Sequence, residues 1–223
     1  MKKHILEVDS VQKSFDIKSI LTDVYLKCET TDIIGLLGRN GSGKSTLLKI
    51  IFGIENANFK FLRIDGVVKN KPSDLFQEIS YLSQDNFIPN HFTVAKAILL
   101  TLDKSKSDAF YEDEFIQTLR TKKISHLSGG ELRYLEIKLV LCNATKFVLL
   151  DEPYNGLSPL LVEKVNLLLQ HHAAHKGIII TDHNYKNVIA IATKLVLMKD
   201  GKAHHLTNKN ELIEKGYLVE GAF

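Results

Sequence analysis

The chain reads Gly38-Arg39-Asn40-Gly41-Ser42-Gly43-Lys44-Ser45-Thr46 between an apolar run at residues 33–37 and a helical pattern at residues 47–52. This order predicts a strand, a tight turn and a helix. Successive backbone N–H groups in such a turn, together with the N-terminus of the helix, surround phosphate groups. Glycine is required because a Cβ atom would obstruct the turn and the close approach of an anion.

Two side chains of this segment add specific chemistry. Lys44 is expected to reach the β and γ phosphates of a nucleotide as a point charge. Ser45 is expected to place its hydroxyl on a magnesium ion. The spacing of Gly38, Gly43, Lys44 and Ser45 is that of a phosphate-binding loop, so the segment predicts a nucleotide site.

Composition limits the class of protein. The 223 residues are 44% apolar and 25% charged, as in globular proteins, and a net charge of +3 gives no reason to expect a nucleic-acid partner. The longest apolar runs are far shorter than the roughly 20 residues that span a bilayer. Acidic residues at positions 7 and 9 interrupt the place where a signal peptide needs its apolar segment, so we expect a cytoplasmic chain.

Apolar runs without alternation recur along the chain and are separated by helical patterns. Such runs predict a mainly parallel α/β sheet buried on both faces; they lie at residues 33–37, 146–150, 177–181 and 195–198. Alternating runs at 5–8, 24–27 and 59–65 predict a small N-terminal antiparallel β region. Between residues 93 and 120 a helical periodicity, broken at the polar residues 103–108, predicts a short helical insert.

Candidate polar residues follow several of these strands. Gly38, Gln84, Asp151 and Asp182 all fall just beyond predicted strand ends, and the strand before Gln84 is the run at residues 79–83. Because ligands of parallel sheets bind outside the carboxyl ends of the strands, we expect these residues at one edge of the sheet. Asp151 is followed directly by Glu152, and such a pair beside a phosphate loop suits magnesium binding and water activation, respectively.

A second glycine segment reads Leu127-Ser128-Gly129-Gly130-Glu131 and opens a helical pattern. Exposed N–H groups at a helix start could bind a second phosphate. The same residues also form an ordinary helix cap, in which Ser128 is followed at the third position by Glu131. The local sequence leaves both interpretations open.

Taken in order, these segments resemble the ATP-binding subunit of ATP-binding cassette (ABC) transporters over essentially the whole chain. Gly38 to Ser45 resembles the Walker A loop, Gln84 the Q-loop, and Leu127 to Glu131 the signature sequence. Residues 147–152 resemble the Walker B strand with its catalytic glutamate, and residues 181–183 resemble the loop of the switch histidine. Phe15 falls where the family has an aromatic residue that stacks on adenine.

The resemblance implies an α/β P-loop ATPase fold, with core residues 1–84 and 127–223 and a helical insert at about 85–126. It implies ATP and Mg²⁺ as cofactors, with phosphates held by Lys44 and the amides from Gly38 to Thr46. Magnesium would be served by Ser45, Gln84 and Asp151. Glu152 would polarise the attacking water, and His183 would contact the γ-phosphate.

The resemblance also implies partners. Two such subunits, here expected to be identical, would meet head to tail, so that Leu127, Ser128, Gly129, Gly130 and Glu131 complete the ATP site of the other copy. A separate integral membrane subunit would dock on the insert, placing the chain on the cytoplasmic face of the membrane. The motifs lean slightly toward the lipopolysaccharide-export and branched-chain amino-acid branches.

Three positions depart from the family pattern. Ser158 stands where an aspartate is usual after the Walker B strand, Thr31-Asp32 replaces a Gly-Glu pair, and the insert is short. Two alternative functions are a soluble ABC ATPase of translation or DNA repair, and a regulatory nucleotide-binding module without turnover. The single Walker A segment argues against the first, and the presence of Glu152 and His183 argues against the second.

Overall fold

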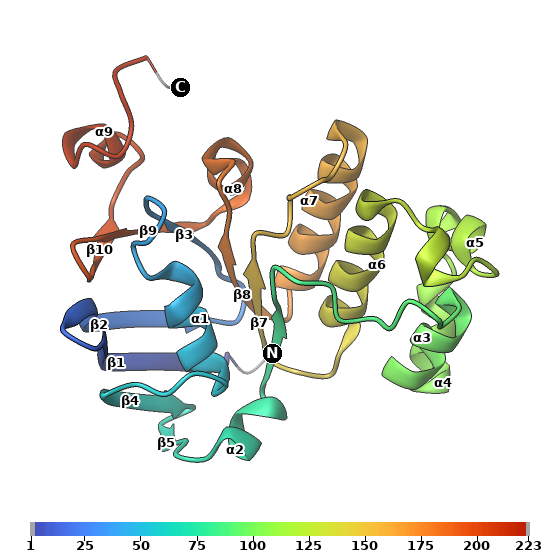
Figure 1. Ribbon diagram of the computed structural model, residues 1–223, viewed down its shortest axis with the longest axis horizontal. Coiled ribbons are helices and arrows are strands. Elements are labelled where there is room, and N and C mark those ends of the chain that lie inside the picture. The colour runs from blue at the N-terminus through green and yellow to red at the C-terminus, as the bar shows by residue number, and fades with distance from the viewer. Residues whose placement is uncertain (1–2, 222–223) are drawn as a thin grey trace.

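The central feature of the computed structural model, which describes residues 3–221, is a six-stranded sheet in the order β10-β9-β3-β8-β7-β6 (Figure 1). Its strands are β3 (Ile33–Leu37), β6 (Ile79–Leu82), β7 (Phe147–Asp151), β8 (Gly177–Thr181), β9 (Lys194–Lys199) and β10 (Lys202–Leu206). All neighbours are parallel except the edge pair β9 and β10. The predicted mainly parallel sheet is confirmed.

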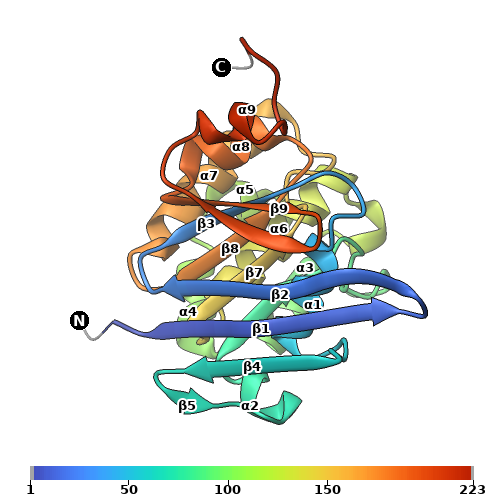
Figure 2. The same ribbon diagram turned by 90° about the vertical axis from the view of Figure 1, so that its left-hand side faces the viewer.

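A second, antiparallel sheet faces the viewer in Figure 2. It contains β1 (Ile5–Phe15), β2 (Lys18–Glu29), β4 (Phe59–Ile64) and β5 (Val67–Val68), in the order β2-β1-β4-β5. The predicted alternation at 5–8, 24–27 and 59–65 marks parts of this sheet. Strands β1 and β2 are longer than those patterns indicate, since together they form one hairpin, whereas β4 ends one residue before the predicted run does.

Helix α1 (Lys44–Phe52) lies between the two sheets. Its residues Leu47, Leu48, Ile50 and Ile51 share one apolar cluster with side chains from both sheets. On the other face of the large sheet, α6 (Gly129–Cys142), α7 (Pro159–Ala173) and α8 (Tyr185–Ile191) contribute to a second cluster. Strand β7 supplies both clusters with alternate residues, which explains its unbroken apolar run.

The insert consists of α3 (Val94–Thr101), α4 (Lys104–Phe110), α5 (Glu114–Leu119) and the 3₁₀ turn η1 (Ile124–His126). It lies beside α6, at the far end of the molecule from the antiparallel sheet (Figure 1). The expected break at residues 103–108 is wrong, because most of that segment is α4. This helix is polar along most of its length and is anchored by Phe110, which is 2% exposed.

The remaining helices are α2 (Pro72–Phe76), which precedes β6, and α9 (Glu211–Glu214), which follows β10. Neither β10 nor α9 was predicted from the sequence. Within residues 3–221, no helix combines the length and apolar character needed to cross a bilayer.

Candidate nucleotide site

The glycine-rich segment forms the turn between β3 and α1. A Cβ atom at Gly38 would lie 2.5 Å from Ser42 Oγ and 2.6 Å from the Met198 carbonyl oxygen. Gly43, the residue before the helix, has φ +94° and would place a Cβ atom 2.7 Å from Leu21 Cδ2. Both positions therefore need glycine for space, and Gly43 needs it for its backbone conformation as well.

Lys44 is 7% exposed and turns its ammonium back onto the loop. Its Nζ donates to the carbonyl oxygens of Gly38 at 2.7 Å and Arg39 at 3.2 Å. Burial lowers the pKa of this ammonium, while the Glu152 and Asp151 carboxylates act in the opposite direction. A buried cation satisfied only by neutral carbonyl groups is suited to an anionic ligand.

Asp151, at the end of β7, is 1% exposed and accepts hydrogen bonds from three hydroxyl groups. Ser45 Oγ lies 3.0 Å from Oδ1, Thr181 Oγ1 2.8 Å from Oδ1, and Tyr81 Oη 3.2 Å from Oδ2. Gln84 Nε2 donates to Ser45 Oγ at 3.3 Å. The three residues expected to serve magnesium, Ser45, Gln84 and Asp151, thus lie together.

These residues fit a magnesium ion. Among the described residues Asp151 has no ion-pair partner, so its buried carboxylate lacks a neutralising cation. Its neighbours are hydroxyl and amide groups, and oxygen is the ligand type that Mg²⁺ prefers. No cluster of three His, Cys, Asp or Glu residues suited to a metal occurs in the described part of the chain, so the remaining ligands would come from phosphate and water.

Sequence reasoning missed Tyr81 and Thr181. Thr181 is the register partner of Asp151 on β8, and Tyr81 lies on the neighbouring strand β6, near its end. Burial raises the pKa of Tyr81, and the nearby Asp151 charge adds to this effect, so the phenol stays protonated and can donate. The position of Thr181 just before Asp182 at a predicted strand end is the signal that could have indicated it.

Glu152 and His183 meet beside this cluster, with Glu152 Oε1 2.7 Å from His183 Nε2. Glu152 has φ +51°, a left-handed conformation that costs energy for a non-glycine residue. Burial raises the pKa of Glu152; the His183 charge opposes that effect, and Asp151 and Asp182 add to it. A carboxyl with a raised pKa beside a phosphate loop is suited to proton transfer.

Asp182 fixes the loops on either side of this pair. Its carboxylate accepts from the backbone N–H groups of Tyr154 at 3.0 Å and Asn184 at 2.8 Å. The segments that follow Glu152 and His183 are therefore held by one buried side chain, which is 5% exposed as a residue.

One cavity of about 390 Å³ brings most of the predicted ATP-site residues together. Its lining includes Phe15, the loop from Asn40 to Thr46, Gln84, Glu152 and His183. Phe15 is 47% exposed, and Lys13 Nζ lies 4.4 Å from the centre of its ring. An exposed aromatic ring at the rim of a phosphate cavity is suited to stacking on a base.

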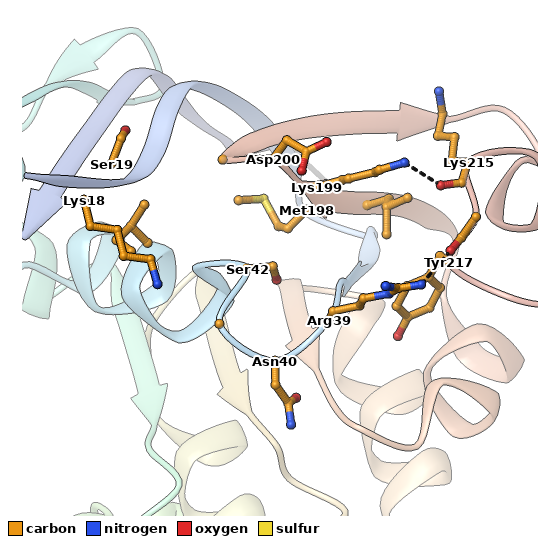
Figure 3. Close-up of a pocket in the computed structure, with 15 residues that line it drawn as sticks. Lys18, Ser19, Arg39, Asn40, Ser42, Met198, Lys199, Asp200, Lys215 and Tyr217 are labelled. Atoms are coloured by element: carbon orange, nitrogen blue, oxygen red, sulfur yellow. Dashed lines mark hydrogen bonds between the residues drawn. The ribbon is translucent and has the colours of Figure 1, made fainter.

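Gly38 and Arg39 do not line that cavity. Figure 3 shows a neighbouring cavity on which Arg39 and Tyr217 border, where the Arg39 side chain turns toward the C-terminal segment. Arg39 Nη2 donates to the Gly216 carbonyl oxygen at 3.2 Å, and Lys199 Nζ donates to that of Lys215 at 2.8 Å. In this conformation the Arg39 side chain contacts the C-terminal segment and lies outside the phosphate cavity.

The second glycine segment lies away from the cavity, at the start of α6. Ser128 caps this helix: its Oγ accepts from the Glu131 N–H at 3.2 Å, and Glu131 Oε2 accepts from the Ser128 N–H at 2.7 Å. A Cβ atom at Gly130 would lie 3.1 Å from the Gly156 carbonyl oxygen, so this glycine allows close packing. Ser128 and Gly129 are exposed.

A phosphate loop between β3 and α1, with an acidic pair at the end of a second parallel strand, defines a P-loop nucleoside-triphosphatase. The family model described as "ABC transporter" matches residues 21–155, which is more than half of the chain. The chain belongs to the ABC transporter family. It is an ATPase chain of that family and binds ATP.

Relatives and solved structures agree with this placement. The lipopolysaccharide export system ATP-binding protein LptB of Acidithiobacillus ferridurans is 26% identical over 94% of this chain and 92% of its own length. ABC transporter A family member 11 of Dictyostelium discoideum is 30% identical over 95% of this chain, which spans 27% of that longer protein. A structure of the ATP-binding subunit of an ABC transporter superposes with a TM-score of 0.83 at 18% identity, covering 95% of this chain and 92% of the other.

Proposed function

We propose that two copies of this chain form a head-to-tail dimer that hydrolyses ATP and powers a separate membrane subunit. The observation that carries the proposal is the separation of two half-sites. Glu152 and His183 border the phosphate cavity, whereas the exposed Ser128 and Gly129 lie on a different part of the surface. A second copy can bring its own α6 N-terminus, with its free N–H groups, over the cavity.

In this site the phosphates bind to the loop amides and to the Lys44 ammonium, which exchanges its contacts with Gly38 and Arg39 for charged oxygens. Ser45, Gln84 and Asp151 would hold Mg²⁺, which would supply positive charge to neutralise the phosphates. Phe15 stacks on the adenine ring.

Glu152 accepts the proton of the attacking water. Its partner His183, whose side chain is 56% exposed, turns to the γ-phosphate and orients it. Because the Glu152 pKa is raised, the carboxylate is a better base than an exposed glutamate would be. The hydrogen bonds of Asp182 to the Tyr154 and Asn184 N–H groups keep the two loops in place during these steps.

A groove of about 500 Å³ at the edge strand β6 supplies the surface for the membrane subunit. Phe76 and Phe87 line it and are each 47% exposed. Thr101 lines it as well, so the groove includes part of the insert on which a membrane subunit is expected to dock. Exposed aromatic residues around a concavity are typical of protein interfaces. Docking here places the chain on the cytoplasmic face of the membrane.

A mixing experiment tests the head-to-tail dimer. Lys44→Ala disables the phosphate loop, and Ser128→Arg blocks the second half-site. In a head-to-tail pair made of one copy of each variant, one composite site keeps both an intact Lys44 and an intact Ser128. We therefore expect two inactive variants whose mixture recovers a fraction of the ATP turnover.

The matched control mixes Ser128→Arg with a Lys44→Ala, Ser128→Arg double variant, which offers no intact composite site. Recovery only in the first mixture supports the dimer. A mixture that stays inactive, although light scattering shows that the two variants associate with ATP present, would contradict it.

A further inference from the structure

One buried side chain lies between the strand ends that carry the candidate catalytic residues, and the sequence analysis did not single it out. Arg133, on the second turn of α6, is 4% exposed. Its Nη1 donates to the Ser83 carbonyl oxygen at 2.7 Å. Its Nη2 donates to the carbonyl oxygens of Asp151 at 2.8 Å and Glu152 at 3.0 Å.

These carbonyl groups lie where the sheet opens. The pairing of β6 with β7 ends at Leu82 and Leu150. Beyond these residues the two segments continue toward Gln84 and Glu152, respectively. The guanidinium group lies between the two strand ends. Its three hydrogen bonds replace the backbone hydrogen bonds that β6 and β7 no longer make to each other at this point. A guanidinium group, with five N–H donors in a fixed planar fork, is well suited to bridge both strand ends at once.

Glu152 depends on this support. Its left-handed backbone, φ +51°, is unfavourable for a residue with a Cβ atom and persists only when its surroundings hold it. The Glu152 N–H donates to the Thr181 carbonyl oxygen at 2.9 Å. The Glu152 carbonyl oxygen accepts from Arg133 at 3.0 Å and, at the longer distance of 3.4 Å, from the Asn155 N–H. Arg133 thus holds one of the two backbone polar groups of the residue that is proposed to activate water.

A second buried side chain links Arg133 to the segment after the Q-loop. Glu136, one turn further along α6, is fully buried, and its Oε2 lies 3.7 Å from Arg133 Nη1. Its Oε1 accepts from the backbone N–H groups of Phe87 at 2.8 Å and Ile88 at 3.4 Å. Glu136 Oε2 has no hydrogen-bond partner among the described residues, so its charge depends on Arg133.

We propose that Arg133 is a positioning residue for Glu152, and that Glu136 ties this position to residues 83–88. The inference rests on the proposed role of Glu152 as the base. Arg133 does not line the phosphate cavity; it acts through the backbone of Glu152. Because Phe87 also lines the groove at β6, a partner that moves this segment would shift Glu136 and, through Arg133, the base itself.

The test combines Arg133→Met, which keeps the length of the side chain and removes the donors, with Glu152→Gln in a double-mutant cycle. In the parent, Arg133→Met should lower single-turnover ATP hydrolysis by about 10²-fold, the effect of a small misplacement, with ATP affinity unchanged. In the Glu152→Gln background the same substitution should cause no further loss, because there is no base left to position. Arg133→Lys, which keeps the charge and loses the planar fork, should give an intermediate rate.

Lys138→Met is the matched control. Lys138 is buried on the same helix and ion-paired with Asp113 at 2.8 Å, but it does not reach the strand ends. The Lys138→Met substitution should lower the melting temperature and leave the rate of ATP hydrolysis by the folded protein unchanged. Equal losses from Arg133→Met with and without Glu152 would overturn the proposal, since they would show a general structural effect.

Should Arg133→Met fail to fold, Arg133→Lys and Glu136→Gln carry the same cycle. A Glu152→Gln variant that keeps the parent rate would instead refute the role of Glu152, whatever the Arg133 variants do.

Discussion

Ser45 and Asp151 are 106 residues apart in the sequence, yet Ser45 Oγ lies 3.0 Å from Asp151 Oδ1. This bond joins the helix that follows the phosphate loop to the strand that ends at the acidic pair. The contact exists because β3 and β7 run parallel, on either side of β8, and therefore end at the same edge of the sheet. The chemistry of the site depends on this alignment.

Glu152→Gln should lower ATP turnover by about 10²–10⁴-fold, the usual contribution of general-base catalysis, while ATP binding persists. Phosphate release and nucleotide affinity measure the two effects separately. Glu163→Gln, an exposed carboxylate on α7, is the control and should leave both unchanged. Loss of ATP binding in Glu152→Gln would instead point to a role in holding the nucleotide.

His172 should make the fold sensitive to acid. Burial, with nearby His171 and Lys176, lowers its pKa to about 4. The unfolded chain takes up this proton near the ordinary histidine pKa of about 6.5, whereas the folded chain takes it up only near pH 4. The free energy of unfolding therefore decreases as pH falls from about 6.5 to about 4. Urea unfolding of the parent and of His172→Gln at several pH values should show a smaller acid-induced loss in the variant.

The control for that measurement is His175→Gln, which changes an exposed histidine just beyond the same helix. Its stability should follow the parent curve at every pH. A His172→Gln variant that follows the parent curve as well would show that other groups cause the acid sensitivity.

Substitution of two glycines, Gly177 and Gly129, should affect stability and ATP turnover separately. A Cβ atom at Gly177 would lie 2.7 Å from Phe147 Cδ1 and 2.9 Å from the Glu29 carbonyl oxygen, so Gly177→Ala should destabilise the fold by about 1–3 kcal/mol. Gly129, in the first turn of α6, would meet nothing within 4 Å. Gly129→Ala should therefore fold as well as the parent, or about 0.4–1 kcal/mol better. If Gly129 approaches a phosphate group bound to the other copy, the ATP turnover of Gly129→Ala should still be lower than that of the parent.

Ser158 tests the departure from the family pattern after the Walker B strand. It caps α7, with Oγ accepting from the Leu161 N–H at 3.4 Å. Ser158→Ala should cost about 0.5–2 kcal/mol of stability, whereas Ser158→Asp should keep the cap. Thermal unfolding measures the difference; equal losses in both variants would contradict the cap as the source of stability, because aspartate can accept the same hydrogen bond.

Much of the fold could be predicted because local patterns and tertiary structure agree. The run before Gly38, the loop and the helix after Lys44 each indicate one element, and the family resemblance supplied their order. The outcome at residues 103–108 shows the limit: polar composition indicated a break, but one buried residue, Phe110, anchors a short helix. Strand β10 was missed because residues 202–206 carry two histidines and a lysine, as an edge strand allows.

The site was predictable where a residue has a motif around it and unpredictable where only the tertiary structure gives it a role. Tyr81, Thr181 and Arg133 belong to this second group. Their hydrogen-bond partners lie 70, 30 and 18 residues away in the sequence, and of the three only Thr181, at a predicted strand end, has a local signal. Arg133 looks like one more residue of a helix face until the split between β6 and β7 is known.

The place of β3 in the sheet has a consequence for synthesis. Its two neighbours are β8 and β9, so Ile33 pairs with Ile178, and Ile34 pairs with both Ile179 and Lys194. When residues 38–45 leave the ribosome, β8 and β9, the strands that flank β3 in the sheet, have not yet been synthesised. The nucleotide pocket must therefore form late, after nearly the whole chain has emerged, and a nascent chain that stops before residue 177 would be unable to use ATP to stabilise its fold.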